Sequence, residues 1–190
     1  MIGNDIIDLN ETKRTTNWKR PGFLKKLFTE TEQHIIAYSE DPFTTVWQLW
    51  SMKESAYKVF IQTGGKPFYN PRRLACNLKA DHGEVLIESM LLKTDTIINA
   101  NYIFSVAKKR ETTAKNGIFK LDGLDIKKQS DVLKQQFLKV ISVENNLNVH
   151  ALAIRKSETG VPKLFNKNTK INVAFSLSHH GKYASYSILN

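Results

Sequence analysis

The first third of the chain has a hydrophobic pattern that predicts one buried strand followed by helices. Residues 2–9 form a short apolar run that contains two carboxylates, which is typical of a buried strand. From 42 to 62, large apolar residues recur at intervals near 3.6 and Thr-Gly-Gly follows, which indicates a long helix with a glycine terminator. Two shorter helices are expected at 21–27 and 29–38, and residues 11–20 are expected to form a loop.

Shorter apolar runs separated by turn residues predict strands over most of the remaining chain. A turn is expected at Asp81-His82-Gly83, and Ser130 is the expected N-cap of a second long helix that runs to about residue 145. The expected strands lie at 73–78, 85–92, 101–107, 150–156, 173–178 and 183–189.

The order of these elements predicts an α+β fold made of two pseudo-repeated subdomains, each with one helix and a three-stranded antiparallel sheet. The first half is expected to span 1–110 and the second half 129–190, with 111–128 as the connection between them. A length of 190 residues is sufficient for one generous domain or for two small ones in close contact.

The charge of the chain indicates anionic partners. Twenty-eight Lys and Arg residues against eighteen Asp and Glu residues give a formal net charge of +10. Residues 1–110 contain 16 basic and 12 acidic side chains, and residues 111–190 contain 12 and 6, so the excess is not confined to a tail. Nucleic acid, a phosphorylated small molecule and an acidic protein all suit this field, and composition leaves the three open.

Cysteine usage and hydropathy indicate where the protein works. The single cysteine, Cys76, excludes an intramolecular disulfide and a multi-cysteine metal site. No apolar run approaches the roughly 20 residues that span a bilayer. The N-terminal residues also lack the basic-then-apolar layout of a secretory signal. We therefore expect a cytoplasmic protein with no membrane partner.

Three segments contain residues suited to chemistry, and each also has a plain structural interpretation. Asp5 lies in an apolar strand, where a carboxylate is costly unless a positive group meets it, or it caps a turn. Glu54 and Lys58 stand four residues apart on one helix face, which also suits a surface ion pair. Ser178 and His179 end a strand before a glycine, where they could present a hydroxyl and an imidazole to a phosphate or form a polar hairpin.

Together, four segments resemble the motifs of one family, the phosphopantetheinyl transferases. Residues 3–8, Gly-Asn-Asp-Ile-Ile-Asp, are similar to its Gly-x-Asp-Ile opening, and residues 50–58, Trp-Ser-Met-Lys-Glu-Ser-Ala-Tyr-Lys, resemble its Trp-x-x-Lys-Glu-(Ser/Ala)-x-x-Lys motif. Residues 159–164 resemble its Gly-x-Pro segment, and residues 175–181 resemble its Ser-(Ile/Leu)-Ser-His motif. In the two-domain (Sfp-type) enzymes the last two motifs come first. The chain therefore resembles a circularly permuted two-domain enzyme.

The resemblance implies the phosphopantetheinyl transferase fold and holo-acyl-carrier-protein synthase activity. In that reaction the 4'-phosphopantetheine group of coenzyme A moves to a serine of an apo acyl or peptidyl carrier protein, and 3',5'-ADP is released. Coenzyme A is then a co-substrate and Mg²⁺ the metal, with Asp5 and Glu54 as its ligands and Asp8 as a further candidate. Glu54 and Lys58 are the implied catalytic residues.

The resemblance also implies which residues hold coenzyme A. The family's Gly-Lys-Pro lysine is Val161 here. The implied contacts are Ser178, His179 and Lys58, with Lys163 as a candidate substitute for the missing lysine and Lys127, Lys128 and Lys134 as candidates for the 3'-phosphate.

On this interpretation the chain acts as a monomer, a pseudo-dimer within one polypeptide, without nucleic acid or membrane. Two alternatives stay open. One is a basic module that binds nucleic acid, which the charge allows although no recognised nucleic-acid motif is present. The other is a family member with altered chemistry.

Overall fold

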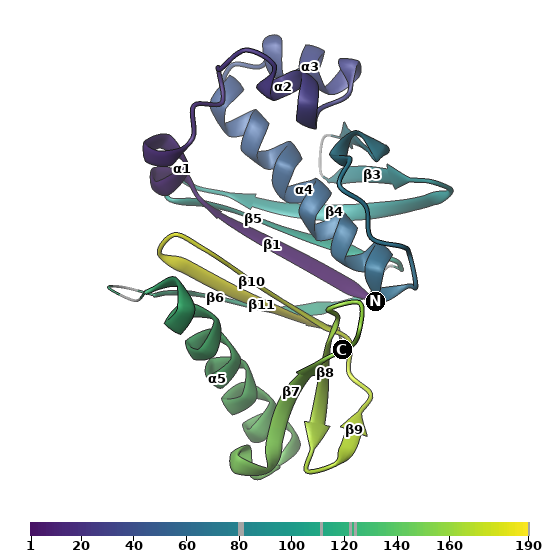
Figure 1. Cartoon of the computed structure of the whole chain (residues 1–190), viewed down its shortest axis with the longest axis vertical. Helices are drawn as coiled ribbons and strands as arrows, with labels where there is room; N and C mark the ends of the chain where they lie inside the picture. Colours follow the sequence, from purple (N-terminus) through teal and green to yellow (C-terminus); the bar gives the residue numbers. More distant parts are fainter. Residues whose placement is uncertain (80–81, 111, 122, 124, 190) are drawn as a thin grey trace.

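The computed structural model describes residues 1–79, 82–110, 112–121, 123 and 125–189, without the side chains of residues 126 and 127. The chain forms two α+β halves that meet along strands in the middle of the molecule (Figure 1). Asp81, in one of the expected turns, lies outside the described residues. No helix within the described ranges is both long and apolar enough to cross a membrane.

The first half is a five-stranded antiparallel sheet with the long helix α4 (Pro42–Gln62) across one face (Figure 1). The strand order is β1-β5-β4-β3-β2. The strands are β1 (Ile2–Asp8), β2 (Leu74–Leu78), β3 (Gly83–Ile87), β4 (Met90–Ile98) and β5 (Tyr102–Lys108). The predicted bounds of α4, 42 and 62, are confirmed. Asp41 caps its start and Thr-Gly-Gly follows its end.

Three short helices precede α4: α1 (Leu9–Thr15), α2 (Phe23–Leu27) and α3 (Glu30–Ala37). The loop expected at 11–20 is wrong for its first part, which belongs to α1. Asp8 starts this helix, because its side chain accepts hydrogen bonds from the backbone N–H groups of Asn10 and Glu11. A capping box between Thr29 and Glu32 starts α3.

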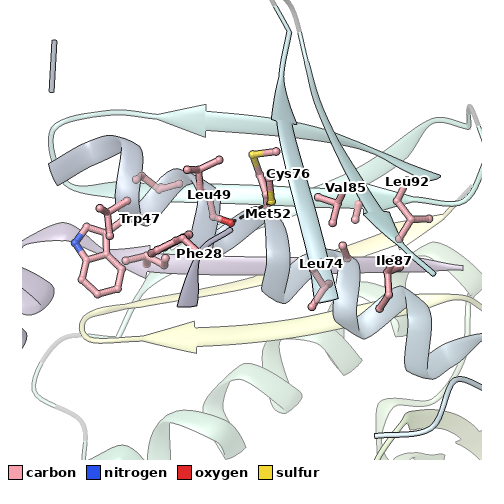
Figure 2. Close-up of a cluster of buried hydrophobic side chains, with 14 of the residues drawn as sticks. Phe28, Trp47, Leu49, Met52, Leu74, Cys76, Val85, Ile87 and Leu92 are labelled. Carbon is pink, nitrogen blue, oxygen red and sulfur yellow. Dashed lines mark hydrogen bonds between the residues drawn. The ribbon is translucent and has the colours of Figure 1, made fainter. Parts of the chain in front are cut away.

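The main hydrophobic core lies between α4 and the five-stranded sheet. Figure 2 shows how side chains of the helix meet those of the strands, and every labelled residue is at most 8% exposed. The labelled residues are Phe28, Trp47, Leu49, Met52, Leu74, Cys76, Val85, Ile87 and Leu92. Cys76, the single cysteine, is a free buried thiol that donates to the carbonyl of Leu49.

The second half contains two three-stranded sheets and helix α5 (Ile126–Asn145). The strand orders are β10-β11-β6 and β7-β8-β9. The elements are β6 (Ala114–Lys120), a 3-10 turn at Val149–Ala151, β7 (Leu152–Lys156), β8 (Pro162–Asn166), β9 (Thr169–Ile171), β10 (Phe175–His180) and β11 (Tyr183–Leu189). The rings of Phe137 on α5 and Phe175 on β10 stack 4.5 Å apart in this core.

The predicted α+β class is confirmed, but the sheets differ from the three-stranded sheet predicted for each half: the first half has five strands in one sheet, and the second half has two three-stranded sheets. The apolar run at 85–92 reverses at Glu88, which has a φ of 54°, and so supplies two strands in place of one. The expected connection at 111–128 contains β6, which pairs with β11 although its sequence has few apolar residues. Helix α5 begins before Ser130, and β8 and β9 were not predicted.

The two halves join along a seam between β1 and β10. Side chains of β10 serve as acceptors for backbone N–H groups at the edge of β1, a substitute for ordinary strand pairing. The three bonds of the seam run from Asn4 N to Ser176 Oγ (3.0 Å), from Ile6 N to Ser178 Oγ (3.3 Å) and from Asp8 N to His180 Nδ1 (3.0 Å). Strand β11 also contacts β1, through the bond from Asn4 Nδ2 to Ser185 Oγ, as expected for neighbouring strands.

Candidate active site

Close approach of α4 to β1 builds the site. Successive side chains of a strand face opposite sides, so Gly3 and Asp5 both face the helix. A Cβ atom on Gly3 would lie 2.0 Å from the carbonyl oxygen of Ser55, so only glycine allows this separation. The absence of a side chain at this position therefore brings the polar residues of α4 onto the strand, among them Glu54 and Lys58.

Asp5 is a nearly buried carboxylate at the junction of the two halves, with 14% of its side chain exposed. Its Oδ1 accepts a hydrogen bond from Ser178 Oγ at 3.0 Å and lies 3.8 Å from Lys58 Nζ. Burial raises the pKa of Asp5, and the charge of Lys58, the Ser178 hydrogen bond, His180 and Ser51 oppose that rise. The carboxylate is thus partly compensated by neighbours from both halves.

Glu54 lies close enough to Asp5 for one charge to affect the other. Burial first and the charge of Asp5 second raise the pKa of Glu54 from 4.5 to about 7, against the opposing effect of Lys58. The fold therefore brings together two acids that are far apart in the sequence. A cation bound between them would relieve their mutual repulsion.

Lys58 connects the carboxylates to both halves of the molecule. Its Nζ donates to the carbonyl of Asn4 at 2.6 Å and to the carbonyl of Leu177 at 3.4 Å. About 30% of the side chain stays exposed, so the ammonium group can also meet a ligand. Lys58 therefore does more than form a surface ion pair with Glu54, the plain structural interpretation of their four-residue spacing.

A cleft of about 550 Å³ opens beside Lys58, between α4 and the second half. Its basic side chains are Lys58, Lys134, Lys156 and His179, and none of the described lining residues is acidic. The remaining lining residues are Tyr57, Ile61, Gln62, Pro67, Ser130, Leu133, Ile154, Thr159, Gly160, Val161, Pro162, Ser176 and Leu177. This mixture suits a ligand with anionic groups and an apolar part.

The carboxylate pair has the chemistry of a magnesium site that the substrate completes. The described residues contain no group of three or more His, Cys, Asp or Glu side chains that could hold a metal by themselves. Magnesium usually keeps several waters and binds through one or two carboxylates together with substrate phosphates. Asp5 and Glu54, beside a basic cleft, fit that requirement.

A family model described as the 4'-phosphopantetheinyl transferase superfamily matches residues 1–107, more than half of the chain. The chain belongs to this superfamily. The curated holo-[acyl-carrier-protein] synthase of Caldanaerobacter subterraneus subsp. tengcongensis is 34% identical to the chain over 67 residues. The aligned stretch is 35% of this chain and 51% of that protein, so the chain spans about half the length of this curated relative.

The superfamily match includes Asp5, Glu54 and Lys58, whereas the Ser-His segment lies outside it, in the second half. In that segment His179 lines the cleft, with its Nδ1 3.2 Å from Gln129 Oε1. Gln129 also donates to the carbonyl of Gly181, which fixes the turn after the histidine. Burial and then nearby positive charge, that of Lys58 first, lower the pKa of His179, so the free protein keeps this imidazole neutral at pH 7.

Both carboxylate oxygens of Asp8, the further candidate ligand, accept hydrogen bonds from backbone N–H groups. Its Oδ1 accepts from the N–H groups of Asn10 and Glu11, and its Oδ2 accepts from the N–H of Lys182 at 2.9 Å. The residue is 2% exposed and faces away from α4, as strand alternation requires. These bonds favour a structural role, in which Asp8 caps α1 and holds the β10–β11 turn.

The candidate lysines separate into those that line the cleft and those that do not. Lys163 is not among the described lining residues, whereas Lys156, opposite Pro162 in the β7–β8 register, is. Sequence reasoning missed Lys156, because its place beside the cleft depends on strand pairing with the Gly-x-Pro segment, which the sequence does not reveal. Of the candidates for the 3'-phosphate, Lys134 lines the cleft, Lys128 is not among its described lining residues, and the side chain of Lys127 lies outside the described residues.

Lys53, in the superfamily's Lys-Glu motif, is a buried structural residue that sequence reasoning also missed. It is 1% exposed, and its Nζ lies 2.8 Å from Glu32 Oε2 and donates to the carbonyls of Pro71 and Leu74. Glu32 in turn accepts from the N–H of Cys76. This network fixes α4 against α3 and β2, and so orients the turn of helix that presents Glu54.

Proposed function

We propose that this protein transfers the 4'-phosphopantetheine group of coenzyme A to a serine of an apo acyl or peptidyl carrier protein, in a Mg²⁺-dependent reaction. The observation that carries the proposal is the pair Asp5 and Glu54, held together beside a basic cleft that Lys58 borders. Membership of the superfamily and the similarity to a holo-[acyl-carrier-protein] synthase support the same conclusion.

The cleft has the charge and the apolar surface that coenzyme A requires. Coenzyme A carries a pyrophosphate and a 3'-phosphate, and Lys58, Lys134 and Lys156 supply three cations around the cleft. The apolar side chains of Ile61 and Leu133 offer surface to the uncharged parts of the molecule. His179 gains a proton more readily once an anion offsets the positive charges beside it.

Asp5 and Glu54 would hold the magnesium ion, which when bound supplies positive charge to the pyrophosphate oxygens. Lys58 adds a second positive charge beside Asp5, where the carbonyls of Asn4 and Leu177 fix it. Because these groups come from β1, α4 and β10, the site requires both halves of the chain.

In the proposed step the hydroxyl oxygen of the carrier serine forms a bond to the phosphorus atom next to pantetheine. The bond from that phosphorus to the bridging oxygen breaks, and the bridging oxygen leaves with 3',5'-ADP. Glu54 accepts the serine proton, directly or through a water. A carboxylate within reach of the serine hydroxyl is a common general base.

The assay is transfer itself, followed by mass spectrometry of the carrier. With coenzyme A and Mg²⁺, at least one of several apo carriers from fatty-acid, polyketide and peptide synthesis should gain the mass of one phosphopantetheine group. No gain on any carrier would contradict the proposal. A larger rise in melting temperature with an oligonucleotide than with coenzyme A and Mg²⁺ would favour the nucleic-acid alternative.

A matched pair of lysine variants tests the cleft. Lys156→Gln should raise the KM for coenzyme A roughly tenfold, since one charge-assisted contact to a phosphate is lost. Lys163→Gln, two residues into the adjacent strand but outside the described cleft lining, should leave the KM unchanged. The opposite order of effects would move the coenzyme A site to the other face of the β7–β8 hairpin.

A further inference from the structure

Ser178 occupies the middle position of the seam and has a partner there that the neighbouring serine lacks. Its Oγ accepts from the N–H of Ile6 at 3.3 Å, and it also donates to Asp5 Oδ1 at 3.0 Å. Ser176, the preceding position, accepts from the N–H of Asn4 at 3.0 Å. In the part of the chain that the structure describes, Ser178 alone of these two bonds to a carboxylate.

The hydroxyl of Ser178 has nothing left to donate to a phosphate. A serine hydroxyl offers one donor and two acceptor lone pairs. The donor is directed at Asp5 and one lone pair receives the N–H of Ile6, so the remaining capacity is an acceptor. A phosphate oxygen, which is itself an acceptor, would be repelled by that lone pair.

Burial leads to the same conclusion. Ser178 is 8% exposed and is not among the described residues that line the cleft, although Leu177 and His179 on either side of it are. Ser178 therefore points toward β1 and, unlike Ser176, Leu177 and His179, is absent from the described cleft lining. Within the Ser-His segment, His179 is placed for coenzyme A and Ser178 is placed for Asp5.

We propose that Ser178 is a positioning residue that orients the carboxylate of Asp5 toward the metal, and that it is not a ligand of the coenzyme A phosphates. This inference rests on the proposed function, because it assigns Ser178 to the magnesium site. A hydrogen bond that fixes a ligating carboxylate commonly matters 10- to 100-fold for metal affinity. Since Asp5 belongs to the first half and Ser178 to the second, docking of the halves prepares the metal site.

The test measures metal binding to the protein alone and again with saturating coenzyme A, whose phosphates complete the proposed site. Mn²⁺ takes the same oxygen ligands as magnesium, and free Mn²⁺ can be counted by electron paramagnetic resonance as the protein is titrated. Ser178→Ala should weaken Mn²⁺ binding roughly 10- to 100-fold. Ser178→Cys keeps the shape of the side chain but offers only a weak donor, so it should also weaken Mn²⁺ binding. It replaces the alanine variant if that variant folds poorly. Ser176→Ala removes the neighbouring seam bond and should leave Mn²⁺ affinity within about threefold of the wild type.

Steady-state kinetics supply the second readout. At saturating Mg²⁺, Ser178→Ala should keep the KM for coenzyme A within about twofold of the wild type and change mainly kcat, since the contact with substrate is unaltered. Wild-type Mn²⁺ affinity together with a raised KM would overturn the inference and make Ser178 a phosphate ligand. Equal losses of Mn²⁺ affinity in Ser176→Ala and Ser178→Ala would overturn it as well. Loss of any seam hydrogen bond would then weaken metal binding, with no specific part for the bond to Asp5. A wild-type protein that binds no Mn²⁺ even with saturating coenzyme A would remove the proposed metal site and this inference with it.

Discussion

Replacing Glu54 with glutamine removes a negative charge that burial and the neighbouring charge of Asp5 both destabilise. In the free protein the pKa of Glu54 is raised from 4.5 to about 7. When an acid has a higher pKa in the folded state than in the unfolded state, the free energy of unfolding is greatest below the unfolded pKa. It falls as the pH rises from the unfolded pKa to the folded pKa, because the folded state must then ionise the acid at a cost. Here the loss occurs between about pH 4.5 and pH 7.

The size of the effect follows from the two pKa values. Each pKa unit corresponds to about 1.4 kcal/mol, so the ionised side chain lowers the free energy of unfolding by about 3 kcal/mol well above pH 7. The part of this loss that develops between pH 5 and pH 8 is about 2–3 kcal/mol. For a chain of this length that is roughly 4–12 °C in melting temperature, and partial solvent screening makes it an upper limit.

The assay compares thermal unfolding of the wild type and Glu54→Gln in EDTA at pH 5 and pH 8. From pH 5 to pH 8 the melting temperature of the variant should rise relative to that of the wild type. The variant should be inactive in transfer. With coenzyme A present, Mg²⁺ should raise the melting temperature of the wild type further and leave that of the variant nearly unchanged. A constant difference between the two proteins at both pH values would refute the reasoning, since Glu54 would then titrate as an ordinary exposed acid.

Two further predictions concern the residues that place α4. Gly3→Ala should lower the free energy of unfolding, measured in urea titrations, by about 1–3 kcal/mol, because the new Cβ would meet the backbone oxygen of Ser55. A variant as stable as the wild type would show that α4 can move away from β1 at no cost. Lys53→Met should cost about 3–5 kcal/mol, because it leaves the buried charge of Glu32 uncompensated. The double variant Lys53→Met, Glu32→Leu should recover much of that loss, and a double variant no more stable than the single one would contradict this account.

Local patterns in the sequence were sufficient for the elements whose signals lie within themselves. Helix α4 has a 3.6-residue period and a glycine terminator, so its extent could be predicted. Strand β6 has no such signal, since it is a strand only because β11 pairs with it. The break between β3 and β4 depends on a single residue, Glu88, whose left-handed conformation a periodicity argument does not detect.

The candidate site divides in the same way. Motif spacing in the sequence indicated Asp5, Glu54 and Lys58, and the structure brings these three together. The circular permutation, the monomeric state and the metal ligands themselves stay predictions. The hydrogen bonds from Lys182 to Asp8 and from Ser178 to Asp5 could not be predicted, because each joins residues more than 170 positions apart in the chain.

The sequence alone determined which residue types are available for chemistry: a carboxylate in an apolar strand, an acid and a base one helical turn apart, and an excess of positive charge. The tertiary structure decided which of them meet. Hydrogen bonds and charge interactions act over a few ångströms, and only the packing of α4 on β1 and of β10 along the seam sets those separations. That is why neighbours in one motif, Ser178 and His179, face different partners.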